Sequence, residues 1–464
     1  MLKKALIERI INEALESTAD FAEVFVESTL QYALSMQDSA IQSAKTKELK
    51  GVGIRIAQGY KSVYGHTNKT DEKSLVSLTQ DLKTAFSGER TREVIKLSKV
   101  QSQNNHSIKT LPNEVDVSQK VSLLKRADKS ARLYSKDIKQ VNVSYMDTVQ
   151  NVTIASSEGV YVKDTRVRTR LGINSVASNK NDMQQGFNGP GGSYGFEFYD
   201  QIDLEEEARE ASRIAVAMLY ADECPSKTMP VVVDNGFGGV IFHEACGHSL
   251  EATSVAKNAS VFSGKKGGKI GSDLVTAVDD GTIPNAWGSA NYDDEGLPQK
   301  RRVLIDKGVL TSYMVDQLNG KRMNEAPTHS SRRQSYRFAP TSRMSNTYID
   351  NGESTFDEII ENTEYGLYAR KMGGGSVNPS TGDFNFSVME GYMIRNGKIA
   401  EPVKGATLVG TGKDALKKID MVGNNLLRAQ GMCGSVSGAI TTDVGQPTIR
   451  ISSMTVGGRK EDAS

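Results

Sequence analysis

The stretch VNVSYMDTVQNVTIASSEGVYVKDTRVRTRLGINSVAS, residues 141–178, carries the clearest fold signal in the chain. Valines and other strand-favouring residues alternate with polar residues on both sides of the tetrapeptide Ser156-Ser157-Glu158-Gly159. Alternation with a period of two predicts half-buried strands, and a polar segment that ends in glycine predicts a turn between them. The stretch therefore predicts a β-meander.

The residues before the meander predict a small α+β unit. Residues 2–17 place apolar side chains on one helical face, and the segment FAEVFVES alternates like a strand. The segment GVGIRIAQGYKSVYGHT reads as a hairpin with its turn near Gln58-Gly59, and a second helix is expected at 71–86. We expect this first domain to span residues 1–90.

A second α+β domain is expected at residues 91–222 and contains the meander. It starts with a polar segment at 99–115 that has no hydrophobic period and predicts a linker or long loop. A helix is expected at 118–134. After the meander, QQGFNGPGGSYG predicts a flexible glycine-rich break, and residues 203–221 predict another helix.

The remaining residues, 223–464, predict a third and larger domain. Short strand-like segments such as RRVLIDKGVLTSYMVD alternate with glycine turns, which favours a mostly antiparallel sheet. The expected fold class is thus α+β, with mixed N-terminal domains followed by a β-rich C-terminal domain. That domain contains the chain's most informative short motif.

Composition argues against several classes of protein. The formal net charge of the 464-residue chain is +1, which argues against a dedicated nucleic-acid binder, since such proteins usually carry a basic surplus. No run of 18 apolar residues is present, so no membrane span is expected. Three scattered cysteines are too few for a disulfide scaffold, and we expect a cytoplasmic protein.

The short motif is FHEACGHSLEA, which begins at Phe242 and places Glu244 directly after His243. His243 and His248 are five residues apart, about 140° around a regular α-helix, whereas histidines four residues apart share one face. Either the two rings do not share a metal ion, or the helix is irregular. A π-bulge would bring both rings onto one face, and Gly247 is a plausible place for it.

A catalytic zinc site usually has three protein ligands, so a third is needed. The residues leave three candidates open: Glu251, which is three positions after His248; His329, in a polar run; and Cys433, in the glycine-flanked segment QGMCGSVSG. We expect Cys224 and Cys246 to be small buried residues.

The motif resembles that of the TldD/PmbA family, and specifically its TldD branch. The resemblance extends in the family's order over residues 230–458 and is less distinctive before residue 220. The blocks that carry it include VFSGKKGGKIGSDLVTAVDDGTIPN, GSANYDDEGLPQKRRVLIDKGVL, SRMSNTYI, YGLYARKMGGGSVNPSTGDFNFSVMEGYMIRNGKI, PVKGATLVGTG, MCG and VGQPTIRISSMTVGG.

The resemblance implies a cytoplasmic zinc-dependent peptidase that matures or degrades unfolded peptides. By position, His243, His248 and Cys433 match the family's Zn²⁺ ligands, and Glu244 matches its catalytic carboxylate, expected as general base. The resemblance also implies a heterodimer with a related PmbA/TldE-type subunit, or else a homodimer. No nucleic-acid or membrane partner is expected.

Two other classes of function stay open. One is a non-catalytic zinc-binding modulator that acts through protein–protein contacts, although a purely structural site would not need Glu244. The other is a structural dimerisation module, against which the complete ligand set argues. Peptide cleavage with and without a chelator separates the three classes.

Overall fold

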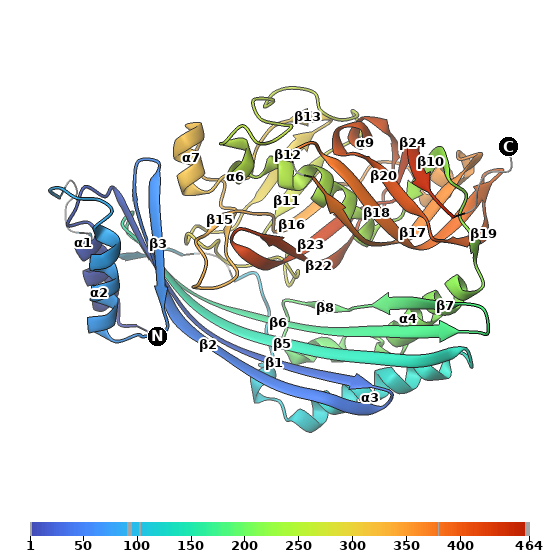
Figure 1. Cartoon of the computed structure of the whole chain (residues 1–464), viewed down its shortest axis with the longest axis horizontal. Coiled ribbons are helices and arrows are strands. Elements are labelled where there is room, and N and C mark those ends of the chain that lie inside the picture. Colours follow the sequence, from blue (N-terminus) through green and yellow to red (C-terminus); the bar gives the residue numbers. More distant parts are fainter. Residues whose placement is uncertain (1, 91–94, 102–103, 379, 460–464) are drawn as a thin grey trace.

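The computed structural model describes residues 2–90, 95–101, 104–378 and 380–459. Among these residues, eight strands from the first half of the chain form one long sheet (Figure 1). The strands of its main path, from one edge to the other, are β3 (Lys61–Thr67), β2 (Ala40–Gln58), β1 (Phe21–Gln37), β5 (Ile138–Ser156), β6 (Val160–Ser178) and β4 (Ser98–Lys99). Two further strands pair with β6, β7 (Met183–Asn188) and β8 (Gly191–Gly192).

The turn expected at residues 156–159 joins β5 to β6, which pair antiparallel over most of their length. The N–H of Gly159 donates to the Ser156 carbonyl at 3.0 Å, and Gly159 has a φ of 83°. Such a positive φ favours glycine, because a side chain would be strained there. The hairpin expected at 51–67 is also confirmed, since β2 and β3 pair through a turn at residues 59–60.

One sequence expectation in this region is wrong. The segment QQGFNGPGGSYG is not a flexible break, because residues 183–188 form β7 and pair with β6. Gly186 is required at that place, since a Cβ there would lie 2.0 Å from the Ala211 carbonyl of the neighbouring helix. Here glycine allows close packing, and a count of glycines in the sequence does not distinguish that use from a loop.

In the described part of the chain, four helices pack on one face of the long sheet, two at each end. Each lies close to its expected range: α1 (Lys4–Ala14), α2 (Glu72–Lys83), α3 (Val117–Leu133) and α4 (Leu204–Leu219). Asp71, Asp116 and Asp203 cap the last three by accepting from backbone N–H groups of the first turn. One apolar core lies between α1, α2 and β1–β3, and another between α3, α4, β5 and β6. Short 3₁₀ turns lie at η1 (Pro112–Glu114) and η2 (Phe196–Asp200).

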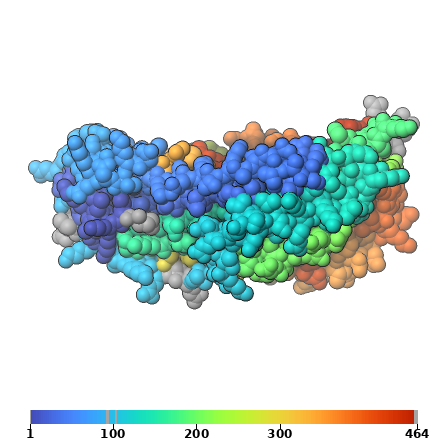
Figure 2. All heavy atoms as spheres, turned by 90° about the horizontal axis from the view of Figure 1, so that it is seen from below, coloured from blue at the N-terminus to red at the C-terminus, as the bar shows by residue number. Residues whose placement is uncertain are grey.

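The two segments that were expected as separate domains, 1–90 and 91–222, contribute strands to this same sheet, because β1 pairs with β5 along almost its entire length. Viewed from below, these segments run along the whole molecule, coloured blue to green in Figure 2. The division of the chain at residues 90 and 222 stays a prediction.

Among its described residues, the C-terminal part contains two larger sheets and a small one. Within the described ranges, the first sheet has β17 (Tyr365–Val377), β10 (Lys227–Val233), β24 (Ile449–Gly457), β20 (Thr407–Thr411), β18 (Asp383–Arg395), β19 (Lys398–Lys404) and β9 (Asp222–Glu223), with β21 (Ile419–Val422) paired to β24. The second has β13 (Val309–Leu310), β12 (Arg301–Asp306), β11 (Ala277–Asp280), β16 (Asn346–Ile349), β23 (Gly438–Gln446) and β22 (Leu427–Ser435). The small sheet pairs β14 (Ser331–Arg332) with β15 (Thr341–Ser342).

Short helices connect these strands, namely α5 (Val240–Phe242), α6 (Ala252–Val255), α7 (Gln317–Met323), α8 (Phe356–Glu361) and α9 (Gly412–Lys418). Most strand pairs are antiparallel, while β10–β17, β16–β23 and β9–β19 are parallel. The predicted α+β class with a β-rich C-terminal part is therefore confirmed. No helix among the described residues is long and apolar enough to cross a membrane.

Buried ion pairs join the long sheet to the C-terminal part. Arg55 of β2 donates to Glu23 of β1 and to Glu295, both at 2.7 Å, and all three side chains are buried. Arg166 of β6 donates to Asp294 at 2.8 Å. Breaking a buried pair leaves an uncompensated charge, so these contacts fix the long sheet against the C-terminal part.

Candidate metal centre

The histidine motif lies in a helical segment that changes its pitch three times. A 3₁₀ turn, η3 (Gly236–Gly239), leads into α5, then a π-helical turn, η4 (His243–Gly247), and then another 3₁₀ turn, η5 (His248–Leu250). The N–H of His248 donates to the carbonyl of His243, five residues back. The expected departure from a regular α-helix is therefore confirmed. The extra residue in the turn places both imidazoles together, with ring centroids 5.2 Å apart at 84°.

Gly247 contributes to the π turn by allowing close packing, and its backbone conformation is ordinary. Its φ of −55° is helical, and a Cβ there would lie 2.3 Å from the sulfur of buried Met344. Gly412, the first residue of α9, packs in the same way on the π turn: a Cβ there would lie 2.2 Å from the carbonyl oxygen of Ala245. The Met344 side chain and the backbone of α9 thus both pack closely against the turn.

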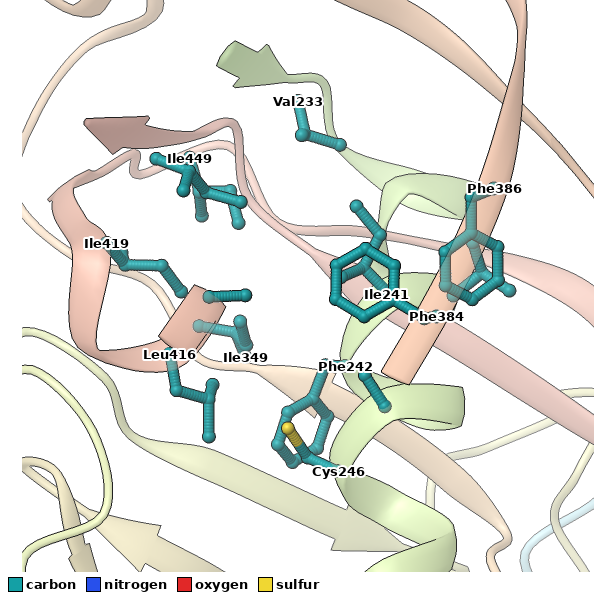
Figure 3. Close-up of a cluster of buried hydrophobic side chains, with 14 of the residues drawn as sticks. Val233, Ile241, Phe242, Cys246, Ile349, Phe384, Phe386, Leu416, Ile419 and Ile449 are labelled. Atoms are coloured by element: carbon teal, nitrogen blue, oxygen red, sulfur yellow. The ribbon is translucent and has the colours of Figure 1, made fainter. Parts of the chain in front are cut away.

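The opposite face of the segment is anchored in the apolar core. Ile241, Phe242 and Cys246 point into a cluster that includes Leu416 and Ile419 (Figure 3). Burial raises the pKa of the Cys246 thiol. Cys246 and Cys224 are both buried, as expected for small core residues.

Cys433 reaches the histidines from β22. Its Sγ lies 3.2 Å from Nε2 of His248, and the ligand atoms of His243, His248 and Cys433 all lie within 4.8 Å of one another. Burial opposes ionisation of the thiol, but the charge and hydrogen bonds of the two histidines lower the pKa of Cys433 to about 3. This environment favours the thiolate of Cys433, the form that binds metal ions.

Contacts behind the cluster orient the rings. Nδ1 of His243 lies 3.1 Å from the hydroxyl of Thr347 on β16, and Nδ1 of His248 lies 3.3 Å from buried Glu251. Burial disfavours the charged form of His248, but the negative charge of Glu251 raises its pKa well above the usual value. With each Nδ1 held from behind, Nε2 is the ring atom available to the cluster.

Arg343 connects the two sides of the cluster. Its guanidinium donates to the Cys433 carbonyl at 2.6 Å and lies 3.7 Å from Glu251. This side chain is fully buried. Arg343 and Thr347 both come from the SRMSNTYI block, and neither was singled out from the sequence, because no short-range spacing relates them to the histidines.

Three other residues named from the sequence, Glu244, Glu251 and His329, lie outside the group of ligand atoms. Glu244 lies at the edge of the cluster, with Oε2 3.6 Å from Nε2 of His248 and its side chain 27% exposed. Glu251 lies behind His248, outside the group of three ligand atoms. His329 is not brought to the cluster. It has a positive φ of 60°, and its Nδ1 faces the Pro298 carbonyl.

Sequence models of three domains match the chain in order. The PmbA/TldA metallopeptidase domain 1 matches residues 22–86, the central domain residues 110–219, and the C-terminal domain residues 226–458. The chain belongs to the PmbA/TldA metallopeptidase family. The resemblance stated from the sequence is confirmed, and membership makes the chain a metallopeptidase, a hydrolase of peptide bonds.

Individual relatives are similar over nearly their full length. The metalloprotease TldD homolog of Buchnera aphidicola from Acyrthosiphon pisum is 33% identical and covers 97% of this chain and 95% of its own. That of Haemophilus influenzae is 34% identical, with 95% and 93% covered. The zinc metalloprotease TldD homolog of Saccharolobus solfataricus is 24% identical, with 97% and 99% covered.

Solved structures share the fold. TldE from Thermococcus kodakarensis superposes with a TM-score of 0.78 at 17% identity, covering 98% of this chain and all of its own. A protein from Thermotoga maritima superposes with a TM-score of 0.80 at 19% identity, with the same coverage. The architecture described above is thus that of a known fold.

Proposed function

We propose that the protein is a zinc-dependent peptidase in which His243, His248 and Cys433 hold one Zn²⁺. The observation that carries the proposal is the convergence of two imidazoles and a thiolate at the π turn. Two nitrogens and one sulfur suit zinc, and three protein ligands leave the fourth position open, as in catalytic sites. The name of the Saccharolobus solfataricus relative, a zinc metalloprotease, supports the choice of metal.

Glu244 is the proposed general base. Zinc, when bound, polarises the scissile carbonyl and lowers the pKa of a water molecule at the site to about 7. The Glu244 carboxylate lies beside His248 without belonging to the group of three ligand atoms. From this position it accepts a proton from the attacking water and returns it to the leaving amine. Thr347 and Glu251 hold the two imidazoles in orientation during both transfers.

The proposed substrate is an unfolded peptide that lies along β22. Within the described residues, β22 is an edge strand of its sheet, and it carries Cys433. Apart from Gly434 and its two chain neighbours, no described residue would lie within 4 Å of a Cβ at this position, and Met432 is 54% exposed. An edge strand binds an extended peptide through main-chain hydrogen bonds, which give affinity with little sequence preference. This suits the maturation or degradation of unfolded peptides.

The glycine-rich segment GGGSVNPSTG, residues 373–382, is a candidate border of the substrate cleft. The structure places its described residues in the hairpin of β17 and β18, and both strands contact η4. Gly374 has open space where a Cβ would be, among the described atoms. We propose that this hairpin borders the peptide path on the side of the π turn.

The proposed partner is a related subunit of the PmbA/TldE type, with a homodimer as the other arrangement. The likeness of this fold to TldE from Thermococcus kodakarensis supports such a pairing. We propose the cytoplasm as the place of action, because all three cysteines are free thiols and one of them is a proposed ligand.

Cleavage of an unfolded protein in the presence and absence of a chelator tests the proposed function. We expect the protein, co-expressed with its related subunit, to degrade fluorescently labelled casein. A strong chelator should abolish cleavage, and added zinc should restore it. His248→Ala should be inactive, whereas His66→Ala, at an exposed histidine away from the cluster, should behave as wild type. Cleavage that persists after complete metal removal would contradict the proposal.

A further inference from the structure

A cavity lies between the long sheet and the C-terminal part, where Figure 1 shows β22 and β23 close to the sheet. It has a volume of about 210 Å³. One wall comes from β1, β2, β5 and β6, and the other from residues 332–335 and the β22–β23 hairpin. Its lining includes four arginines, Arg166, Arg168, Arg332 and Arg333, and we call it the arginine cavity.

All four of these arginines are at least nine-tenths buried, and only two are neutralised. Arg166 pairs with Asp164 and Asp294, and Arg333 pairs with Glu23. The other two contact only neutral oxygens. Arg168 donates to the carbonyls of Trp287 and Ser289 at 3.1 and 3.3 Å.

Arg332 donates to the Met344 carbonyl at 2.7 Å and to the Thr441 hydroxyl at 3.4 Å. Among the described residues, no carboxylate oxygen forms an ion pair with Arg168 or Arg332. Both guanidinium groups thus lie buried at the cavity without a negative partner.

The acidic residues that line the cavity are already engaged. Asp294 accepts from Arg166 through one oxygen and from the backbone N–H of Arg333 through the other. Glu27 accepts from the Thr29 hydroxyl, the Gln150 amide and the backbone N–H of Tyr336. Neither carboxylate offsets the charge of Arg168 or Arg332 at hydrogen-bond distance.

Two buried guanidinium groups without a carboxylate at hydrogen-bond distance are costly, because burial and the positive charge of neighbouring arginines both act against their charge. Burial, and then the positive charge of Arg332, lowers the pKa of Arg168 to about 9. Burial lowers the pKa of Arg332 to about 10, although the negative charge of Asp294 acts in the opposite direction. An oxyanion between them would offset both effects, since guanidinium matches carboxylate and phosphate oxygens in charge and geometry.

The arginine cavity is separate from the metal centre. Met432 lines the cavity and is half exposed, whereas the next residue, Cys433, is buried in the metal cluster. Successive residues of a strand point to opposite faces. The two sites therefore lie on opposite faces of β22, one residue apart along the strand.

We propose that the arginine cavity binds an oxyanion, a carboxylate or phosphate group, between Arg168 and Arg332. The carboxylate of an acidic peptide and free phosphate share this chemistry. Binding there requires neither turnover nor the metal ligands, so the proposal does not depend on the peptidase activity.

Thr148 offers a direct test, because it lines the cavity and is the cross-strand partner of Arg168. Residues directly opposite on neighbouring strands have Cβ atoms about 5 Å apart. Thr148→Glu therefore supplies an internal carboxylate, while Thr148→Gln supplies a neutral side chain of similar size. We expect the glutamate variant to have a higher melting temperature than the glutamine variant without any ligand.

Ligand binding to the intact protein is then measured by calorimetry. The probes are inorganic phosphate and N-acetylglutamate amide, and the uncharged glutamine analogue of the second probe serves as its control. All titrations use the same chloride concentration. We expect Thr148→Gln to bind as wild type, and Thr148→Glu and Arg332→Gln to bind at least about tenfold more weakly. Arg337→Gln, at an exposed arginine outside the lining, should bind as wild type.

Binding of phosphate alone would support the proposal with a free anion as ligand, and binding of the glutamate compound alone would support it with a peptide carboxylate. Absence of binding by both probes would overturn it. Binding that Thr148→Glu leaves undiminished would overturn it as well. Thr148→Glu is expected to stabilise the protein. Its binding can therefore be measured even if Arg332→Gln fails to fold.

Discussion

Glu244→Gln is expected to keep the metal and to lower kcat by at least about 100-fold. Glutamine is nearly the same shape and can still hydrogen-bond the attacking water, but it cannot accept a proton from it. Metal content is expected to stay near that of the wild type, because Glu244 lies beside the three ligand atoms without joining them. Metal analysis and steady-state kinetics of the same preparation check both parts.

Glu251→Gln is the matched comparison for that variant. Glu251 contacts Nδ1 of His248 from behind and lies near Arg343, so its loss is expected to weaken metal binding first. If Glu244→Gln lost both metal and activity, Glu244 would itself be a ligand. If Glu244→Gln kept both, another group would activate the water, and Glu251 would be the next carboxylate to test.

The second large effect is expected at Cys433. Cys433→Ala removes the only thiolate of the cluster, and we expect it to lower zinc affinity by more than the roughly 10- to 100-fold typical of outer-shell changes. Cys246→Ala is expected to keep full metal content, because that thiol points into the apolar core (Figure 3). Competition with a chromogenic chelator measures both affinities.

The comparison between the two thiols has a separate control for folding. Cys246→Ala removes buried volume and is expected to reduce stability by about 1 kcal/mol, whereas its zinc affinity should not change. Equal loss of metal in the two variants would mean that Cys433 is not the thiol ligand. Thermal unfolding of the zinc-free proteins distinguishes a loss of fold from a loss of metal.

Local sequence patterns predicted much of the fold. The helices α1–α4 and the turns at residues 59–60 and 156–159 follow from hydrophobic period and glycine placement. The pairing of β1 with β5 could not be predicted, because it joins strands about a hundred residues apart that no local signal relates. β7 was missed because its glycine, Gly186, serves close packing on α4.

The candidate site was likewise predicted only in part from the sequence. The spacing of His243 and His248 predicted an irregular helix if both rings face one ion, and a π-bulge was the irregularity considered; the structure has this π turn. The third ligand stayed open between Glu251, His329 and Cys433 until the resemblance was used, since Cys433 reaches the site through the sheet. Thr347 and Arg343 gave no signal for the same reason.

X-ray absorption at the zinc edge tests the proposed ligand set most directly. With stoichiometric zinc bound, we expect one sulfur at about 2.3 Å and two imidazole nitrogens at about 2.0–2.1 Å, completed by one light atom. Such a spectrum would support His243, His248 and Cys433 as the ligands. A first shell without sulfur, or failure of the purified protein to bind zinc at all, would contradict the proposed metal centre.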